Sequence, residues 1–148
     1  MPALNAPPYD EAGNVEPHDH DGIQLTDGII RRIPERWVVD DVKAATGRRL
    51  SSLAFRPSSG PNGGMSIDLQ QQIEDDGLDA KKFVTTPYWV GSIGFVAAAL
   101  RAEEFNIGFD PTPENPYHGQ VWGTFSKGKQ KTLRQLCDWF VPIPDVSI

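Results

Sequence analysis

His118 is the residue whose type and setting point most directly to chemistry. It follows the proline-rich run PTPENPY (111–117) and is the one histidine outside the N-terminal segment. Proline fixes its own φ angle and restricts the residue before it, so this loop holds Asn115 and His118 in few conformations. A stiffly held imidazole can serve as a general acid or base, which makes His118 the candidate catalytic residue. The alternative is structural: the ring hydrogen-bonds a backbone carbonyl and fixes the loop.

Arginines form a second group that could bind a ligand. Arg31 and Arg32 lie in GIIRRIP (28–34), and Arg56 lies in SSLAFRP (51–57). If these segments are neighbours, their guanidinium groups could line a pocket for phosphate or carboxylate. The alternative leaves the arginines solvated on an exposed face. The candidate ligand-binding residues are therefore Arg31, Arg32, Arg56, Asn115 and His118.

The N-terminal segment contains metal-capable side chains at His18, Asp19 and His20. Alternate residues of an extended chain point to the same side, so both imidazoles could reach one ion. The rest of the sequence offers no evident third ligand, and we expect neither a metal site nor a cofactor. The chain also lacks the GxSxG, Walker and GxGxxG motifs of common hydrolases and nucleotide-binding folds.

Apolar runs bounded by turn residues predict the elements that must position these side chains. Strands are predicted over 28–34, 51–57, 65–69, 90–98, 107–111 and 118–125, with a hairpin between the second and the third. Helices are predicted over 35–45, 69–77, 79–85 and 126–141. Asp79 and Ser126 are the expected N-caps of the last two helices, and Gly47 is expected at the end of the first.

The predicted elements add up to an α+β fold, a small mixed or mainly antiparallel sheet with a C-terminal helix packed on it. At 148 residues the chain suits one domain, which we place at residues 27–148. Residues 1–26 are rich in proline and acids and poor in large apolar groups. This composition predicts a flexible or partner-ordered acidic tail outside the domain.

Charge and hydropathy narrow the environment in which the protein works. The formal net charge is −6, which disfavours nucleic-acid binding unless a local basic patch overrides it. The single cysteine, Cys137, excludes an intramolecular disulfide and indicates a buried thiol. No signal-peptide pattern is visible, and the longest weakly polar run (89–100) is shorter than the roughly 20 residues of a membrane helix. We therefore expect a cytoplasmic protein with no membrane association.

Three motifs carry a resemblance to a known family. The combination of RRLSSLAFRP (48–57), MSIDL (65–69) and NPYHGQVWG (115–123) resembles a family of small uncharacterised bacterial proteins. The similarity would extend over about residues 28–140 and leave the N-terminal segment outside it. The resemblance implies that these positions recur together, and it implies no activity.

A weaker similarity is to ADP-ribosyltransferase-like folds. It would place Arg31 or Arg32 on a first strand, Ser52 on a second and His118 on a late strand. Those folds also carry a late glutamate. Here the residues after Asn115 include Gln120 but no acid until Asp138, which argues against transferase activity.

Two classes of function follow from these features. The first is a non-enzymatic interaction protein: a subunit, an inhibitor, or an antitoxin- or immunity-like accessory of a larger bacterial toxin or defence protein. Small size, acidic charge and a tail suited to folding on binding favour it. Its candidate aromatic anchors are Trp37, Tyr88, Trp89, Tyr117 and Trp122. The second is a small enzyme or binder that acts on a phosphorylated nucleotide or RNA end through the arginines and His118. On sequence alone we favour the first.

Overall fold

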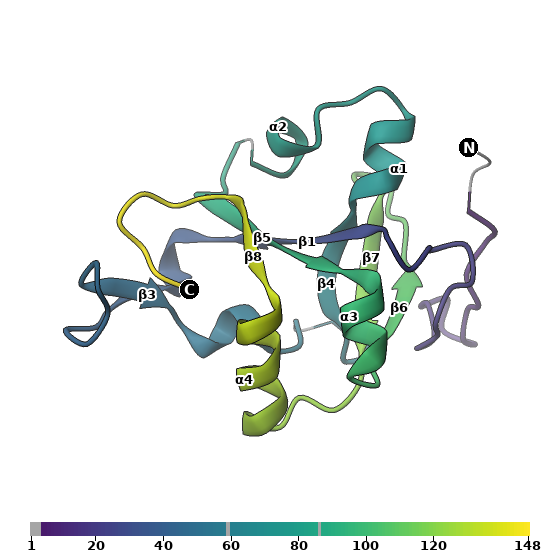
Figure 1. The fold of residues 1–148 in the computed structure, drawn as a ribbon. Helices are drawn as coiled ribbons and strands as arrows, with labels where there is room; N and C mark the ends of the chain where they lie inside the picture. The colour runs from purple at the N-terminus through teal and green to yellow at the C-terminus, as the bar shows by residue number, and fades with distance from the viewer. Residues whose placement is uncertain (1–3, 59, 86) are drawn as a thin grey trace.

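A six-stranded antiparallel sheet forms the centre of the fold (Figure 1). The computed structural model describes residues 4–58, 60–85 and 87–148. The strands of this sheet are β1 (Gly28–Ile33), β4 (Met65–Leu69), β5 (Gly91–Val96), β6 (Asn106–Phe109), β7 (His118–Trp122) and β8 (Asp138–Val141). Their order is β6-β7-β4-β1-β5-β8, and each neighbouring pair is antiparallel. The predicted α+β class is confirmed.

Helices cover both faces of the sheet. α1 (Gln70–Asp75) and α2 (Ala80–Thr85) lie on one face, and α3 (Ala97–Ala102) and α4 (Lys127–Leu136) lie on the other (Figure 1). Asp79 Oδ1 accepts from the backbone N–H of Lys81 at 3.0 Å, and Ser126 Oγ accepts from that of Lys129 at 3.2 Å. Both predicted N-caps are therefore confirmed. No helix in the described ranges is long and apolar enough to cross a bilayer.

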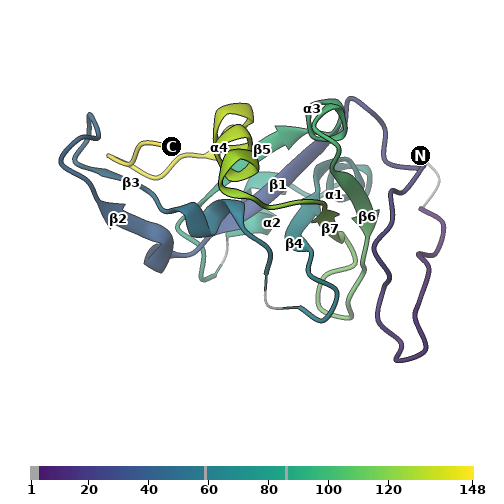
Figure 2. The same ribbon diagram turned by 90° about the horizontal axis from the view of Figure 1, so that it is seen from below.

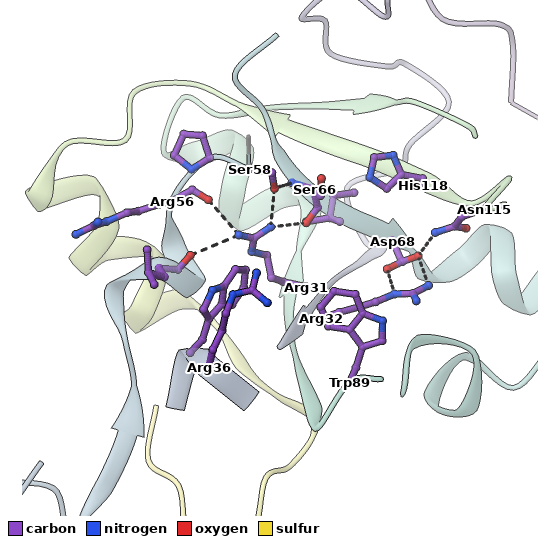
Figure 3. Close-up of a pocket in the computed structure, with 14 residues that line it drawn as sticks. Arg31, Arg32, Arg36, Arg56, Ser58, Ser66, Asp68, Trp89, Asn115 and His118 are labelled. Atoms are coloured by element: carbon purple, nitrogen blue, oxygen red, sulfur yellow. Dashed lines mark hydrogen bonds and ion pairs between the residues drawn. The ribbon is translucent and has the colours of Figure 1, made fainter. Parts of the chain in front are cut away.

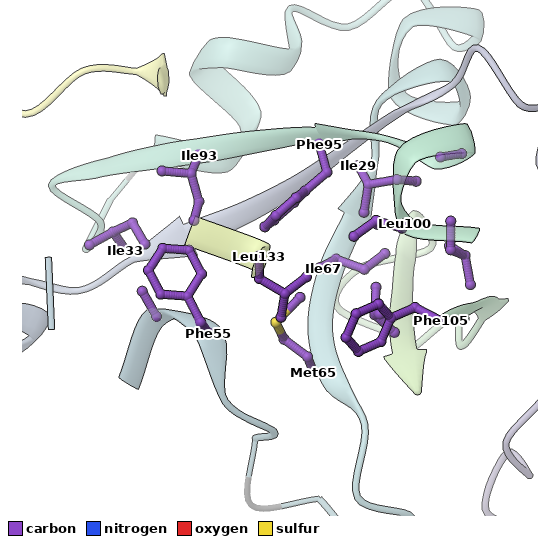
Figure 4. Packing of buried hydrophobic residues seen from close by; sticks show 14 of the residues in the cluster. Ile29, Ile33, Phe55, Met65, Ile67, Ile93, Phe95, Leu100, Phe105 and Leu133 are labelled. Atoms are coloured by element: carbon purple, nitrogen blue, oxygen red, sulfur yellow. The ribbon is translucent and has the colours of Figure 1, made fainter. Parts of the chain in front are cut away.

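β1 supplies the centre of the core because it is apolar on both faces. Ile29 packs in the cluster that includes Leu133 of α4 (Figure 4). Ile30 points to the opposite face and packs against Ile73 of α1. A strand buried on both sides reads as a continuous apolar run rather than an alternating one. The two arginines that follow Ile30 interrupt this run, and they mark the place where the sheet opens.

β1 and β4 pair over only two residues and then separate. Ile29 faces Leu69 and Ile30 faces Asp68, whereas β1 pairs with β5 along its whole length. β4 continues beside β7 back to Met65. The C-terminal half of β1 and the N-terminal half of β4 therefore share no ladder, and the side chain of Arg31 reaches across this gap.

Residues 35–57 differ from the sequence prediction. The predicted helix over 35–45 is wrong: the short 3₁₀ helix η1 (Glu35–Trp37) leads into β2 (Val38–Asp40), which pairs with β3 (Arg48–Leu50). The predicted strand over 51–57 is also wrong, because it contains the 3₁₀ helix η2 (Ser52–Phe55). The predicted hairpin between 51–57 and 65–69 is therefore also wrong, since β4 pairs with β1 and β7. Two successive β-branched valines explain the preference of 38–40 for a strand.

The C-terminal helix is shorter than predicted. α4 ends at Leu136, and residues 138–141 form β8 on the edge of the sheet beside β5. Trp139 and Phe140 favour a strand, because aromatic side chains pack well on a pleated surface. Beyond β8 the chain runs beside β3, where the backbone N–H of Leu50 donates to Ser147 O at 2.9 Å.

The segment 4–26 packs along the outer edge of β6, where the sequence predicted a flexible or partner-ordered tail (Figure 2). The Asp19 carboxylate accepts from the backbone N–H of Ile107 at 2.9 Å. His18 Nε2 accepts from the backbone N–H of Phe109 at 3.1 Å. The backbone N–H of His20, whose side chain is buried, donates to Ile107 O at 2.8 Å. Polar groups make these contacts, and Ile23 of the same segment is buried in the core cluster. The flexible or partner-ordered character of residues 1–26 stays a prediction.

Candidate functional site

A pocket of about 500 Å³ lies where β1 and β4 separate (Figure 3). Its walls come from β1, from β4, from the first residue of β7 with the loop before it, and from the residues of and around η1 and η2. Volumes of roughly 300–1,000 Å³ are typical of small-molecule sites. We call it the fork pocket, and its chemically important residues are Arg31, Arg32, Arg36, Asp68, Asn115 and His118.

Arg31 fills the gap between the two strands with a buried guanidinium. Its Nη1 donates to Ser66 O on β4 at 2.8 Å and to Ser58 Oγ at 3.3 Å. Its Nε and Nη2 donate, over 3.1–3.5 Å, to the backbone carbonyls of Leu53, Ala54 and Arg56. These contacts tie η2 to β1 and β4, in the place of a backbone ladder. Each acceptor is electrically neutral, so none compensates the positive charge.

The charge of Arg31 is costly where it lies. Burial lowers the pKa of Arg31 to about 10, because the guanidinium ion loses hydration. At neutral pH the group still carries its proton. In the described part of the chain no carboxylate forms an ion pair with it, and the ring of Trp37, at 4.7 Å from the guanidinium carbon, offsets part of the cost. An anion in the fork pocket would supply the missing countercharge.

Arg32 points to the other face of β1 and pairs with Asp68, the one acidic residue in the pocket wall. The contact has two bonds, Nε to Oδ2 at 2.8 Å and Nη2 to Oδ1 at 3.0 Å. Asn115 Nδ2 donates to the same Oδ1 at 2.6 Å. Asp68 is thus fully engaged and presents no free carboxylate to an incoming anion. The Nη1 of Arg32 has no hydrogen-bond partner among the described residues.

His118 starts β7 directly opposite Asp68 in the β4–β7 ladder. Its Nδ1 lies 2.8 Å from Asp110 O and 3.4 Å from Asp110 Oδ2. A carbonyl oxygen can only accept, so Nδ1 carries the proton. The hydrogen bond required by the structural alternative is therefore present. The same hydrogen bond fixes the orientation of the ring. Nε2 has no partner within the described ranges and stays available to a ligand.

Sequence reasoning missed Arg36 in the wall of the fork pocket, and it named Trp37 and Trp89 only as candidate anchors for a protein partner. Arg36 is exposed, lies 5.7 Å from the Trp37 ring, and forms no hydrogen bond or ion pair among residues that the structure describes. Trp89 lies 5.9 Å from the Arg32 guanidinium. The run RRIPERW (31–37) contained a signal, since it holds three arginines and a tryptophan. The sequence prediction divided this run between a strand over 28–34 and an incorrect helix over 35–45. Arg36 was therefore not considered together with Arg31 and Arg32.

Arg56 meets the other predicted ligand-binding residues at the fork pocket, but its guanidinium points away from Arg31 and toward α4 (Figure 3). Its Nη2 donates to Ser52 Oγ at 2.8 Å, and its Nε donates to Gln130 Oε1 at 3.4 Å. The positive charge of Arg56 therefore lies over the neighbouring surface. Of the five predicted residues, Arg31, Arg32, Asn115 and His118 place their side-chain polar groups at the pocket.

Other candidate residues lie elsewhere. Ser52, which the ADP-ribosyltransferase resemblance would place on a second strand, lies in η2 and outside the fork pocket. The His18 ring accepts a hydrogen bond from β6, whereas the His20 ring lies 2.8 Å from Asn5 O within the N-terminal segment itself. Within the described ranges no three histidine, cysteine or acidic side chains gather as a metal site would require.

Comparison with protein-family models, with curated proteins and with solved structures finds no match for this chain. The motif resemblance to small bacterial proteins therefore stays an expectation. The geometry and charge of the fork pocket carry the functional argument.

Proposed function

We propose that the fork pocket binds a phosphorylated nucleotide, with its phosphate beside Arg36, Arg32 and His118. The observation that carries this proposal is the charge of the pocket wall. Several arginines face one carboxylate, Asp68, and that carboxylate is already bound to Arg32 and Asn115. In an acidic protein such a local excess of positive charge selects an anionic ligand.

Each residue has a distinct part in this binding. Arg31 has no free donor and acts as a fixed charge at the base of the pocket. Arg36 and the Nη1 of Arg32 retain open N–H groups, which suit phosphate oxygens. Trp37 and Trp89 provide aromatic surface for a base.

His118 gives the pocket its one group suited to proton transfer. Nδ1 is held by Asp110 O, so Nε2 is oriented before a ligand arrives. Such an oriented imidazole can donate a hydrogen bond to a phosphate oxygen when protonated, or accept a proton when neutral. We therefore assign His118 to the phosphate end of the ligand, and we retain it as the candidate general acid or base.

The hypothesis of a non-enzymatic interaction protein gains no comparable support. Of the five proposed aromatic anchors only Tyr88 is exposed, whereas Trp122 is buried and the others are partly buried. The N-terminal segment, which this hypothesis would dock on a partner, makes hydrogen bonds to β6. A larger protein partner and a cytoplasmic location remain predictions.

The proposal is tested by isothermal titration calorimetry with adenosine 5′-monophosphate and adenosine. We expect the monophosphate to bind at least about tenfold more tightly, because a hydrogen bond to a charged group contributes roughly 1.5–3 kcal/mol. Arg36→Gln should remove most of this difference. Arg48→Gln is the matched control, because Arg48 is an exposed arginine on β3 outside the pocket wall. Equal binding of the two ligands, or no binding of the monophosphate, would refute the proposal.

A further inference from the structure

A second hollow of about 290 Å³ lies between η2 and α4. It shares Arg56 with the fork pocket, so the two are adjacent. Its basic residues are Arg56, Lys127, Lys131 and Arg134, and none of the described residues that line it is acidic. We call it the α4 hollow.

The charges around the α4 hollow lack acidic partners. In the described part of the chain none of its four cations forms an ion pair. Arg134 Nη1 donates to Leu50 O at 2.9 Å, and the guanidinium lies 4.8 Å from the Phe55 ring. Arg56 bonds only to neutral oxygens of Ser52 and Gln130. Neutral contacts hold Arg56 and Arg134 at the hollow, and the charge of all four cations is left uncompensated among the described residues.

The sequence of α4 strengthens this argument. The N-terminal turn of a helix carries a partial positive charge, so acidic residues stabilise it and basic residues oppose it. α4 has no acid in its first turn, and it places Lys127 there, with Lys131 one turn later on the same side. The first turn of the helix thus opposes its own dipole at the rim of a basic hollow, whereas Arg134 in the last turn is placed favourably. A bound anion would relieve both the repulsion among the cations and the unfavourable dipole interaction.

We propose that the α4 hollow binds a second phosphate group of the ligand whose first phosphate lies in the fork pocket. This inference rests on the proposed function. Arg56 stands at the boundary of the two hollows and directs its guanidinium to the second. The ligand is therefore a nucleotide with two separated phosphates. These phosphates belong either to one nucleoside or to the end of a phosphodiester-linked strand.

Three probes test the inference: adenosine 5′-monophosphate, adenosine 3′,5′-bisphosphate and the 5′-phosphorylated dinucleotide pApA. We expect the preferred two-phosphate ligand to bind at least about tenfold more tightly than the monophosphate, by the same charged hydrogen bonds. The double variant Lys127→Gln/Lys131→Gln should abolish this gain and leave monophosphate binding unchanged. It should also make binding of the two-phosphate ligand less sensitive to salt, because fewer screened charge contacts then contribute to binding. Lys43→Gln/Lys81→Gln is the matched control, since neither lysine lines either hollow.

The outcomes separate this inference from the proposed function. A gain with the bisphosphate assigns both phosphates to one nucleoside, and a gain with pApA alone assigns them to a strand. Monophosphate binding with no gain for either larger probe overturns the inference and leaves the proposed function intact. A gain that survives in Lys127→Gln/Lys131→Gln also overturns it. Binding of the two-phosphate probes alone, abolished in that variant, would place a phosphate in the α4 hollow without the fork pocket, which rejects the proposed function and overturns the inference as stated. No binding of any probe overturns both.

Discussion

Arg31 connects the architecture of the protein to its proposed ligand. Its side chain lies in the gap between β1 and β4 and donates to oxygens from η2, from Ser58 and from Ser66. A buried charge without a countercharge is expensive, whereas buried acceptors left without a donor are also expensive. The first cost is present with Arg31, and the second appears when the guanidinium is removed. The change in the free energy of unfolding on removing the guanidinium shows which cost is larger.

We expect Arg31→Met to lower the free energy of unfolding by about 3 kcal/mol, because at least two of the abandoned carbonyls would stay buried and unsatisfied. Urea denaturation followed by tryptophan fluorescence measures this change. Arg48→Met, at an exposed position, should change stability by less than about 0.5 kcal/mol. An Arg31→Met protein more stable than the wild type would mean that the uncompensated charge dominates.

Cys137 gives a prediction about pH. Burial raises the pKa of its thiol from the ordinary 9.0 to about 12. Between these values the folded protein retains a proton that the unfolded chain releases. The stabilisation from the neutral, partly buried thiol is therefore complete below pH 9.0 and is lost as pH rises toward about 12. Wild type should lose stability relative to Cys137→Ala above pH 9.0, as measured by urea denaturation at several pH values. Parallel pH profiles would contradict this prediction.

At the scale of elements, β6 and the segment 4–26 depend on each other. β6 is the last strand of the sheet, and an unprotected edge strand invites pairing with another chain. The carboxylate of Asp19 and the ring of His18 occupy two backbone N–H groups of β6. The segment therefore completes the edge of the sheet with side chains rather than with a further strand.

Asp19→Ala should speed amide hydrogen exchange at Ile107, because that N–H loses its acceptor, and it should also remove the ion pair with Arg101. Asp21→Ala is the matched control for Asp19→Ala, because the Asp21 side chain is 96% exposed. Unchanged exchange at Ile107 in Asp19→Ala would show that the carboxylate does not protect the edge.

Removal of residues 1–26 should expose the whole edge of β6 and produce larger assemblies in size-exclusion chromatography with light scattering.

At the scale of the whole molecule, charge is divided unevenly. The fork pocket and the α4 hollow together contain seven of the 14 lysine and arginine residues but one of the 20 acidic residues. The remaining surface is therefore strongly negative. A small anion is attracted to the two hollows, whereas a long polyanion would meet repulsion over the rest of the surface. The sequence-based argument against nucleic-acid binding used the net charge of the whole chain. It does not describe the local charge at the fork pocket and the α4 hollow.

Much of the fold could be predicted from local sequence. GIIRRI, MSIDL and HGQVW are short apolar or alternating runs bounded by turn residues, and they form β1, β4 and β7. Ser126 and Asp79 cap helices because a side-chain oxygen can reach backbone N–H groups two or three residues ahead. Residues 35–57 could not be predicted this way. Near-helical spacing over a few residues did not outweigh the pairing of Val38 with Leu50.

The sequence by itself indicated Arg31, Arg32 and His118 as residues that could bind an anion, and it predicted the α+β fold that carries them. Only the tertiary structure decided that Arg31 and His118 reach one pocket, that Arg36 joins them, and that Arg56 turns toward α4. The physical reason is the range of the interactions involved. Strand propensity and capping act within a few residues, whereas the site depends on β4 lying between β1 and β7 and on the early end of the β1–β4 pairing. Long-range pairing of this kind leaves no signal in any single stretch of the chain.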